Sequence, residues 1–288
     1  MSSRHHVPPT YVSSLCILEH IDPNLRFTLS HRCPSLESIE KSVPLRIKDL
    51  HIKPLELTMN DTCYQIGIIR KYHPKIPTPS EIACTNFLGG KKFDLDQYGF
   101  QVADVPVQED PNEVSIDGRN FNKNRLKWRE RWEKEKFEEM EDQLEKLKKE
   151  RDLPTGEERR FFRIMDDRLT FVSIERRIEE LEYQLLPFQL RRAQALPTFT
   201  HYIQLAISKG IERRCERLNY SGSVYEAMKY FIWKFFAGRN RNGFVMTKRI
   251  DMEFNGLIRL PKNLKIEAKM GNLEEEELEL LGGVVEFC

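Results

Sequence analysis

The spacing of the apolar residues changes from helical to alternating at Pro44, and this change sets the fold class. Before it, Leu15 and Leu18 stand three positions apart, as on one face of a helix. After it, "LRIKDLHI" and "LELTM" alternate apolar and polar residues, which is typical of half-buried strands. Alternation returns at residues 250–254 and 264–270, after long helical segments. Strands and helices do not alternate one by one, so the sequence predicts an α+β fold with antiparallel β modules.

Residues 10–43 predict three short helices that form a small N-terminal helical unit. Asp22 suits a helix N-cap, Pro23 suits the first helical position, and Pro34 begins the third helix. Helices this short are not stable alone in water, so they must pack on other parts of the chain or on a partner. Two interpretations stay open, a docking module and a cap on the first sheet. The side chains that would anchor a partner are Leu15, Leu18, Leu25 and Leu29.

Turn residues connect the predicted strands. Asn60-Asp61 predicts a turn between two of three antiparallel strands in residues 45–72. Asn255-Gly256 predicts a tight hairpin with positive φ at both turn positions. Before it, Ser221 or Ser223 would cap a helix with an apolar face that ends at Gly238.

Residues 123–195 consist mostly of strong helix formers and are highly charged. Their apolar residues step by three and four, and the second series begins at Phe171. The break at "LPTGEE" predicts a long charged helical hairpin, and one longer interrupted helix is the alternative. The residues of the helical seam are Phe137, Met140, Leu144, Leu147, Ile174, Ile178, Leu181 and Leu185.

These patterns predict six consecutive segments. The segments are 1–9, a disordered N-terminus; 10–43, an F-box-like helical unit of degenerate sequence; 44–122, a first β module with a Pro-rich connector and loop; 123–195, the charged helical hairpin or coiled coil; 196–272, a second α+β module; and 273–288, an acidic tail.

Five short motifs stand out: "RCPSL", "VPLRIK-L" and "NDT-Y--G" within residues 31–72, "YGF" at 98–100, and "RLP--LK" within 226–270. They resemble a nematode-expanded family of F-box C-type proteins, whose shared region is a domain of unknown function. The resemblance implies an adaptor whose F-box holds a Skp-type linker subunit of a cullin ubiquitin ligase while the remainder binds a target. Such F-boxes usually open with Leu-Pro and end near a Trp. Here the segment opens with Tyr11-Val12-Ser13, and the first Trp is Trp128, so the match is partial and degenerate.

The sequence predicts no catalytic, metal-binding or cofactor-binding residues. The six cysteines are spread out, without a CxxC pair or Cys/His spacing for zinc, and are expected to be buried, reduced thiols. Gly89-Gly90-Lys91-Lys92 lacks the first glycine and the final Ser/Thr of a phosphate-binding loop. We therefore expect no cofactor and no enzyme activity.

The charge and hydropathy of the chain argue against nucleic acid and membrane as partners. The net charge of +1 argues against nucleic acid, although Arg213-Arg214 and Arg239-Asn240-Arg241 are basic and have aromatic neighbours. No apolar run is long enough for a spanning helix, and no signal peptide is visible, so we expect no membrane and a cytoplasmic or nuclear location. The expected function is that of a non-catalytic interaction protein that binds other proteins, as a substrate adaptor. The alternative is a coiled-coil scaffold that self-associates through the charged helices.

Overall fold

The computed structural model describes residues 11–102, 110–119, 123–152, 160–165, 168–239 and 244–288. The predicted disordered segment 1–9 lies outside these residues. The chain divides into two compact units. The first comprises Met1–Gly67, Val105–Arg119 and Ile203–Cys288, and the second comprises Ile68–Asp104 and Asn120–Tyr202.

Helices and strands are mixed along the chain, which confirms the α+β class. The helices are α1 Tyr11–His20, α2 Pro23–Arg32, the 3-10 turn Pro34–Leu36, α3 Glu37–Lys41, α4 Ser80–Phe87, α5 Lys123–Arg151, α6 Ile174–Ala193, α7 Val224–Phe236 and α8 Glu275–Leu280. The strands are β1 Leu45–Lys53, β2 Glu56–Met59, β3 Thr62–Tyr72, β4 Glu113–Asp117, β5 Arg160–Met165, β6 Arg168–Ser173, β7 Phe199–Lys209, β8 Glu212–Asn219, β9 Val245–Met252, β10 Leu257–Pro261, β11 Ile266–Gly271 and β12 Val285–Phe287.

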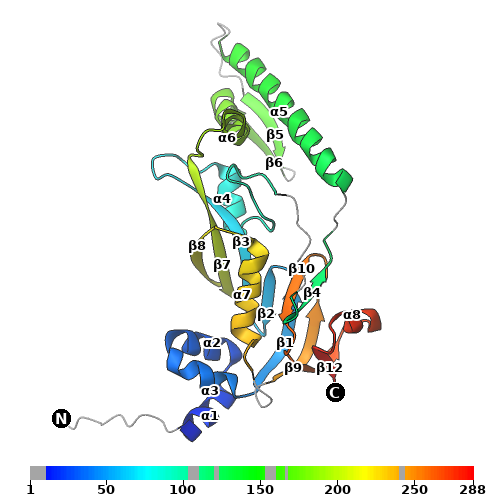
Figure 1. The fold of residues 1–288 in the computed structure, drawn as a ribbon. Helices are drawn as coiled ribbons and strands as arrows, with labels where there is room; N and C mark the ends of the chain where they lie inside the picture. The colour runs from blue at the N-terminus through cyan, green and yellow to red at the C-terminus, as the bar shows by residue number, and fades with distance from the viewer. Residues whose placement is uncertain (1–10, 103–109, 120–122, 153–159, 166–167, 240–243) are drawn as a thin grey trace, which may run out of the picture. The chain divides into compact units, whose positions relative to one another are not determined.

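The main sheet has the order β12-β11-β9-β1-β2-β3-β7-β8 (Figure 1). Strands β1, β2 and β3 are antiparallel, with Leu50 opposite Met59 and Leu57 opposite Tyr64. The β1–β9, β9–β11 and β11–β12 pairs are parallel, so the prediction of purely antiparallel modules was wrong for this half of the sheet. Alternation shows only that one face of a strand is buried, and both kinds of pairing can produce it.

The predicted hairpin at Asn255-Gly256 was also wrong. Strand β10 pairs with β4 instead of β9, and neither turn residue has a positive φ. There is no room for a side chain at Gly256, because a Cβ atom there would lie 2.7 Å from the Cβ and Cγ atoms of Pro54. Its carbonyl accepts a hydrogen bond from the N–H of Gly118, and this bond links the turn to the end of β4 (3.0 Å).

Helix α7 supplies much of the core of the first unit. Its N-cap is Ser223, whose hydroxyl accepts from the N–H of Tyr225, as predicted for that serine. Six apolar residues of the helix are buried: Val224, Met228, Phe231, Ile232, Phe235 and Phe236. They meet the inward side of the sheet, where Tyr64 of β3 lies against the rings of Phe231 and Phe235.

Several elements were not predicted from the sequence. Residues 73–122, predicted as connector and loop, contain α4 and β4, and the predicted acidic tail ends in β12. Residues between α5 and α6 form the β5–β6 hairpin, which includes Phe171, so Phe171 does not begin the seam of α6. These elements have five to eight residues in most cases, too few to show a period.

Candidate partner-binding surface

Helix α2 is held in place by polar contacts at its beginning. Asp22 caps the helix, and its carboxylate accepts from the N–H groups of Asn24 (2.9 Å) and Leu25 (3.3 Å). The buried Asn24 side chain donates to the carbonyl of Met59 (3.2 Å) and accepts from the Tyr64 hydroxyl (2.8 Å). The cap and these contacts fix the first turn of α2 against β2 and β3.

A buried ionic group ties α2 to α3 and to the end of α7. Arg26 is fully buried and donates to the carbonyls of Glu40, Val43 and Pro44 at 2.7–3.0 Å. Oε1 of Glu40 pairs with Arg26 at 3.0 Å and with Arg239 at 2.7 Å. Burial lowers the pKa of Arg26, and the adjacent carboxylate of Glu40 opposes this effect. Because buried ions must be paired and hydrogen-bonded to be tolerated, this group requires one defined arrangement of the helices.

Lys41, at the end of α3, makes a further link to α7. Its Nζ atom donates to the carbonyls of Lys234 (2.5 Å) and Phe235 (3.0 Å). Burial, followed by the charge of Arg239, lowers the pKa of Lys41 to about 8. Helices α2 and α3 are therefore attached to the core by polar contacts, and α1 packs on α3 through its buried side.

The structure separates the four leucines that were predicted to bind a partner. Leu18 is only 4% exposed and belongs to the core, whereas Leu25 is 51% exposed. Leu15 and Leu29 are half-buried. Leu18, one of the predicted partner anchors, is therefore a core side chain in this structure, because α1 turns that side toward the rest of the unit.

Other apolar residues of α1 and α2 face outward instead. Tyr11, Val12 and Ile17 of α1 are more than half exposed, as is Leu25 of α2. We use the name α1–α2 surface for these four exposed side chains together, of which Val12 and Ile17 lie on different sides of α1. Sequence spacing could not identify them, because residues on both sides of α1 are apolar.

The seam residues of the charged helices come together in the second unit. Met140 and Leu147 of α5 form one buried cluster with Ile174, Ile178, Leu181 and Leu185 of α6. Phe137 and Leu144 pack against this cluster, together with Phe188. Among the described residues, the seam is thus occupied by packing between α5 and α6. Trp128 and Trp132, on the same helix α5, are exposed.

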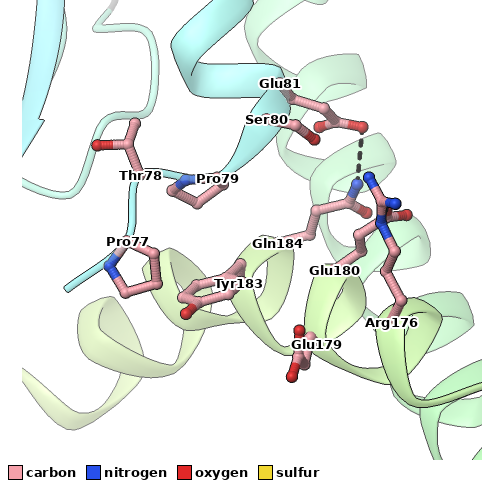
Figure 2. A pocket seen from close by; sticks show the side chains of 10 residues that line it. All are labelled: Pro77, Thr78, Pro79, Ser80, Glu81, Arg176, Glu179, Glu180, Tyr183 and Gln184. Atoms are coloured by element: carbon pink, nitrogen blue, oxygen red, sulfur yellow. Dashed lines mark hydrogen bonds and ion pairs between the residues drawn. The ribbon is translucent and has the colours of Figure 1, made fainter.

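A small pocket lies between the start of α4 and the side of α6 (Figure 2). Its volume is about 220 Å³, and Pro77 and Pro79 line it together with Tyr183 and carboxylates. Gln184 donates to Glu81 across one end (2.9 Å; Figure 2). Glu180 pairs with Arg177, outside the lining (3.1 Å). The lining contains hydroxyl groups and carboxylates, but no histidine or cysteine.

The exposure of the six cysteines differs from the prediction. Five of them are exposed and Cys63 is half-buried, whereas buried thiols were expected. Among the described residues, no cluster of His, Cys, Asp and Glu could hold a metal ion. Within the same part of the chain, no helix has the length and apolar character needed to cross a membrane.

Comparison of the chain with protein-family models, with curated proteins and with solved structures found no match.

Proposed function

We propose that the chain is a non-catalytic interaction protein that binds a protein partner through the α1–α2 surface. The observation that carries the proposal is the contrast within these helices. The buried group around Arg26 and Glu40 fixes the inner side of α2, and Leu18 is buried on α1, while Tyr11, Val12, Ile17 and Leu25 remain exposed. A rigid helical unit with exposed apolar side chains can bind a partner without a large entropic cost of ordering.

The first partner to test is a Skp-type linker subunit. The resemblance of residues 31–72 to F-box C-type proteins supports this choice, because that family is expected to hold such a linker with its N-terminal helices. The chain would then act as a substrate adaptor of a cullin-type ubiquitin ligase. Its target is a second protein that the rest of the chain would bind.

Titration of purified linker subunit into the chain, followed by calorimetry, tests this function. Interface anchors often contribute about 2 kcal/mol or more each. The double variant Ile17→Asp and Leu25→Asp should therefore weaken binding at least a hundredfold. It should unfold at a temperature close to that of the wild type, because both side chains are more than half exposed.

Two further variants serve as controls. Met270→Asp adds a carboxylate at an exposed methionine of β11 and should leave binding unchanged. Leu18→Ala removes a core side chain and should lower stability by about 2–5 kcal/mol. Wild-type chain that does not bind the linker would exclude the adaptor function, and equal binding by the double variant would exclude this surface.

A second candidate function is self-association as a scaffold, and the exposed tryptophans of α5 favour it. Trp128 and Trp132 are one helical turn apart, and Lys136 lies over the Trp132 ring at 4.8 Å. Because the seam is filled within the chain, these rings are the surface that a second copy would use. Analytical ultracentrifugation of wild type and of Trp128→Ser with Trp132→Ser tests it. A wild type that stays monomeric at high concentration would exclude the scaffold.

A further inference from the structure

Strand β8 forms one edge of the main sheet, and it is exposed along its whole length. The sheet order ends at β8, which is joined to β7 by the two residues Gly210 and Ile211. All eight residues of β8 are exposed, and so are Ile211 and Leu218 as apolar side chains. An edge strand offers a row of N–H and C=O groups to which another strand can be added.

The opposite edge of the sheet differs in length. Strand β12 has three residues, and short edge strands are one way in which proteins limit the addition of further strands. Strand β8 is long enough for a complete ladder with a peptide of similar length. The charged side chains of β8 can favour some added strands over others.

The charges of β8 are distributed unequally between its two faces. Successive side chains of a strand point to opposite sides, so Arg213, Cys215 and Arg217 share one side. The other side carries Glu212, Arg214 and Glu216, and Arg214 forms an ion pair with Glu216 at 2.7 Å. One side of the edge is therefore basic and contains no acidic residue of β8, while the other side has one more acidic than basic residue.

A second copy of the chain fits this edge poorly. Two antiparallel β8 strands related by a two-fold axis would pair residues of the same face, so each register has a defined set of opposite residues. Every register centred between residues 213 and 217 puts like charges directly opposite, which is destabilising. The like-charged pairs are Arg213 with Arg213, Arg214 with Arg214, Glu212 with Glu216, Arg213 with Arg217, Glu216 with Glu216, and Arg217 with Arg217.

We infer that β8 is a binding site for an extended acidic segment of a partner protein, which adds to the sheet as a further strand. Two acidic residues four positions apart in that segment would lie opposite Arg213 and Arg217. The residue between them would face Cys215 and should be small or apolar. Opposite charges across neighbouring strands stabilise the pairing, and backbone hydrogen bonds supply sequence-independent affinity. This site is separate from the α1–α2 surface and does not depend on the function proposed for it.

The probe for this site is an eight-residue valine-rich peptide with glutamate at positions 3 and 7 and alanine at position 5, labelled for fluorescence anisotropy and titrated with the full chain. The wild type should bind it, and Arg213→Glu with Arg217→Glu should weaken binding at least tenfold. The charge-matched control is Lys248→Glu with Lys269→Glu, at exposed residues of β9 and β11, and it should bind like the wild type. All four residues are exposed, so the melting temperature should confirm that both variants are folded.

A second peptide tests whether the backbone is involved. It has the same sequence but N-methyl groups on its four central amides, and it should not bind if the peptide adds as a strand. Equal binding by both peptides, equal binding by the β8 variant, or no binding by the wild type would each overturn the inference. Single-stranded oligouridine that binds in place of the peptide, and is lost in the β8 variant, would also overturn it in favour of a nucleic-acid site.

Discussion

The aromatic rings of Phe27 and Phe235 are stacked, with centroids 3.8 Å apart and an interplanar angle of 15°. Phe27 belongs to α2 near the beginning of the chain, and Phe235 belongs to the last turn of α7. The edge of Phe27 also meets the rings of Tyr64 and Phe231. This stack joins the N-terminal helices to the sheet and to α7, so we expect the four rings to stabilise the unit jointly.

Phe235→Ala should be strongly destabilising. The side chain is almost completely buried, and its removal would leave a cavity beside Phe27 and Tyr64. Phenylalanine-to-alanine changes in a core typically cost about 3–5 kcal/mol. Chemical denaturation should measure that loss, and Phe235→Leu, which keeps more of the volume, should lose less.

The control for this prediction lies on the same helix. Tyr230 is exposed on α7, so Tyr230→Ala should change stability by less than about 1 kcal/mol. Similar losses of stability in both variants would contradict the assignment of Phe235 to the buried side of α7 and of Tyr230 to its exposed side.

Local signals were readable in the sequence, whereas the partners of each element were not. Asp22 and Ser223 cap helices as predicted, because capping involves residues two or three positions apart. The pairing of β1 with β9 joins segments about 200 residues apart, and no local pattern encodes such a pair.

The same limit applies to the candidate site. Leu18 and Leu25 are equally apolar in the sequence, and only the packing of α1 and α2 decides that one is core and the other exposed. The seam of α5 and α6 was readable because it depends on a repeated period within each helix. The edge position of β8 depends on the order of the whole sheet, which the sequence does not reveal.

Gly256→Val should destabilise the first unit, although not because of a hairpin. The added Cβ atom would lie 2.7 Å from two atoms of the Pro54 ring, so the turn or the proline must move. Overpacking of this kind typically costs about 1–3 kcal/mol. A thermal melt should show a lower melting temperature, and Gly256→Ala should show most of the effect because its Cβ atom makes the same contact.

Gly222 provides the comparison for that change. A Cβ atom there meets no heavy atom within 4 Å, so Gly222→Ala should leave the melting temperature nearly unchanged. If Gly256→Ala were as harmless as Gly222→Ala, the close approach to Pro54 would be contradicted.

Carboxylates placed in the helical seam should loosen the pairing of α5 with α6. Leu181 is fully buried in the seam cluster, whereas Leu144 packs at its border. Burial of an unpaired carboxylate costs several kcal/mol unless it is protonated, so Leu181→Asp should have the larger effect and Leu144→Asp the smaller. Hydrogen exchange of the amides of both helices should become faster in that order.

A variant at an exposed position of α6 distinguishes the effect of lost packing from the effect of added charge. Gln189→Asp adds a carboxylate to α6 at an exposed residue and should leave hydrogen exchange in α5 unchanged. Faster exchange in this variant, or unchanged exchange in Leu181→Asp, would contradict the assignment of the seam.

His201 should make the stability of the second unit depend on pH in the acidic range. Burial lowers the pKa of this histidine to about 4 from its usual value of 6.5, and the positive charge of Arg70 adds to the effect, while Asp96 opposes it. The Arg70 guanidinium lies over the Phe199 ring at 4.2 Å, and that ring contacts the imidazole of His201. The folded chain therefore keeps this histidine neutral at pH values where the unfolded chain protonates it.

The sign of the pH effect follows from this difference in proton binding. Above pH 6.5 both states carry a neutral imidazole, so His201 has no pH-dependent effect. As the pH falls from 6.5 toward 4, only the unfolded state gains the proton, and the free energy of unfolding decreases; below about 4 the effect levels off. In His201→Leu this histidine's contribution is absent, so the free energy of unfolding should decrease less between pH 6.5 and 4 than in the wild type. Denaturant titrations at a series of pH values measure both slopes, and parallel slopes for the two proteins would show that the imidazole is solvated and titrates normally.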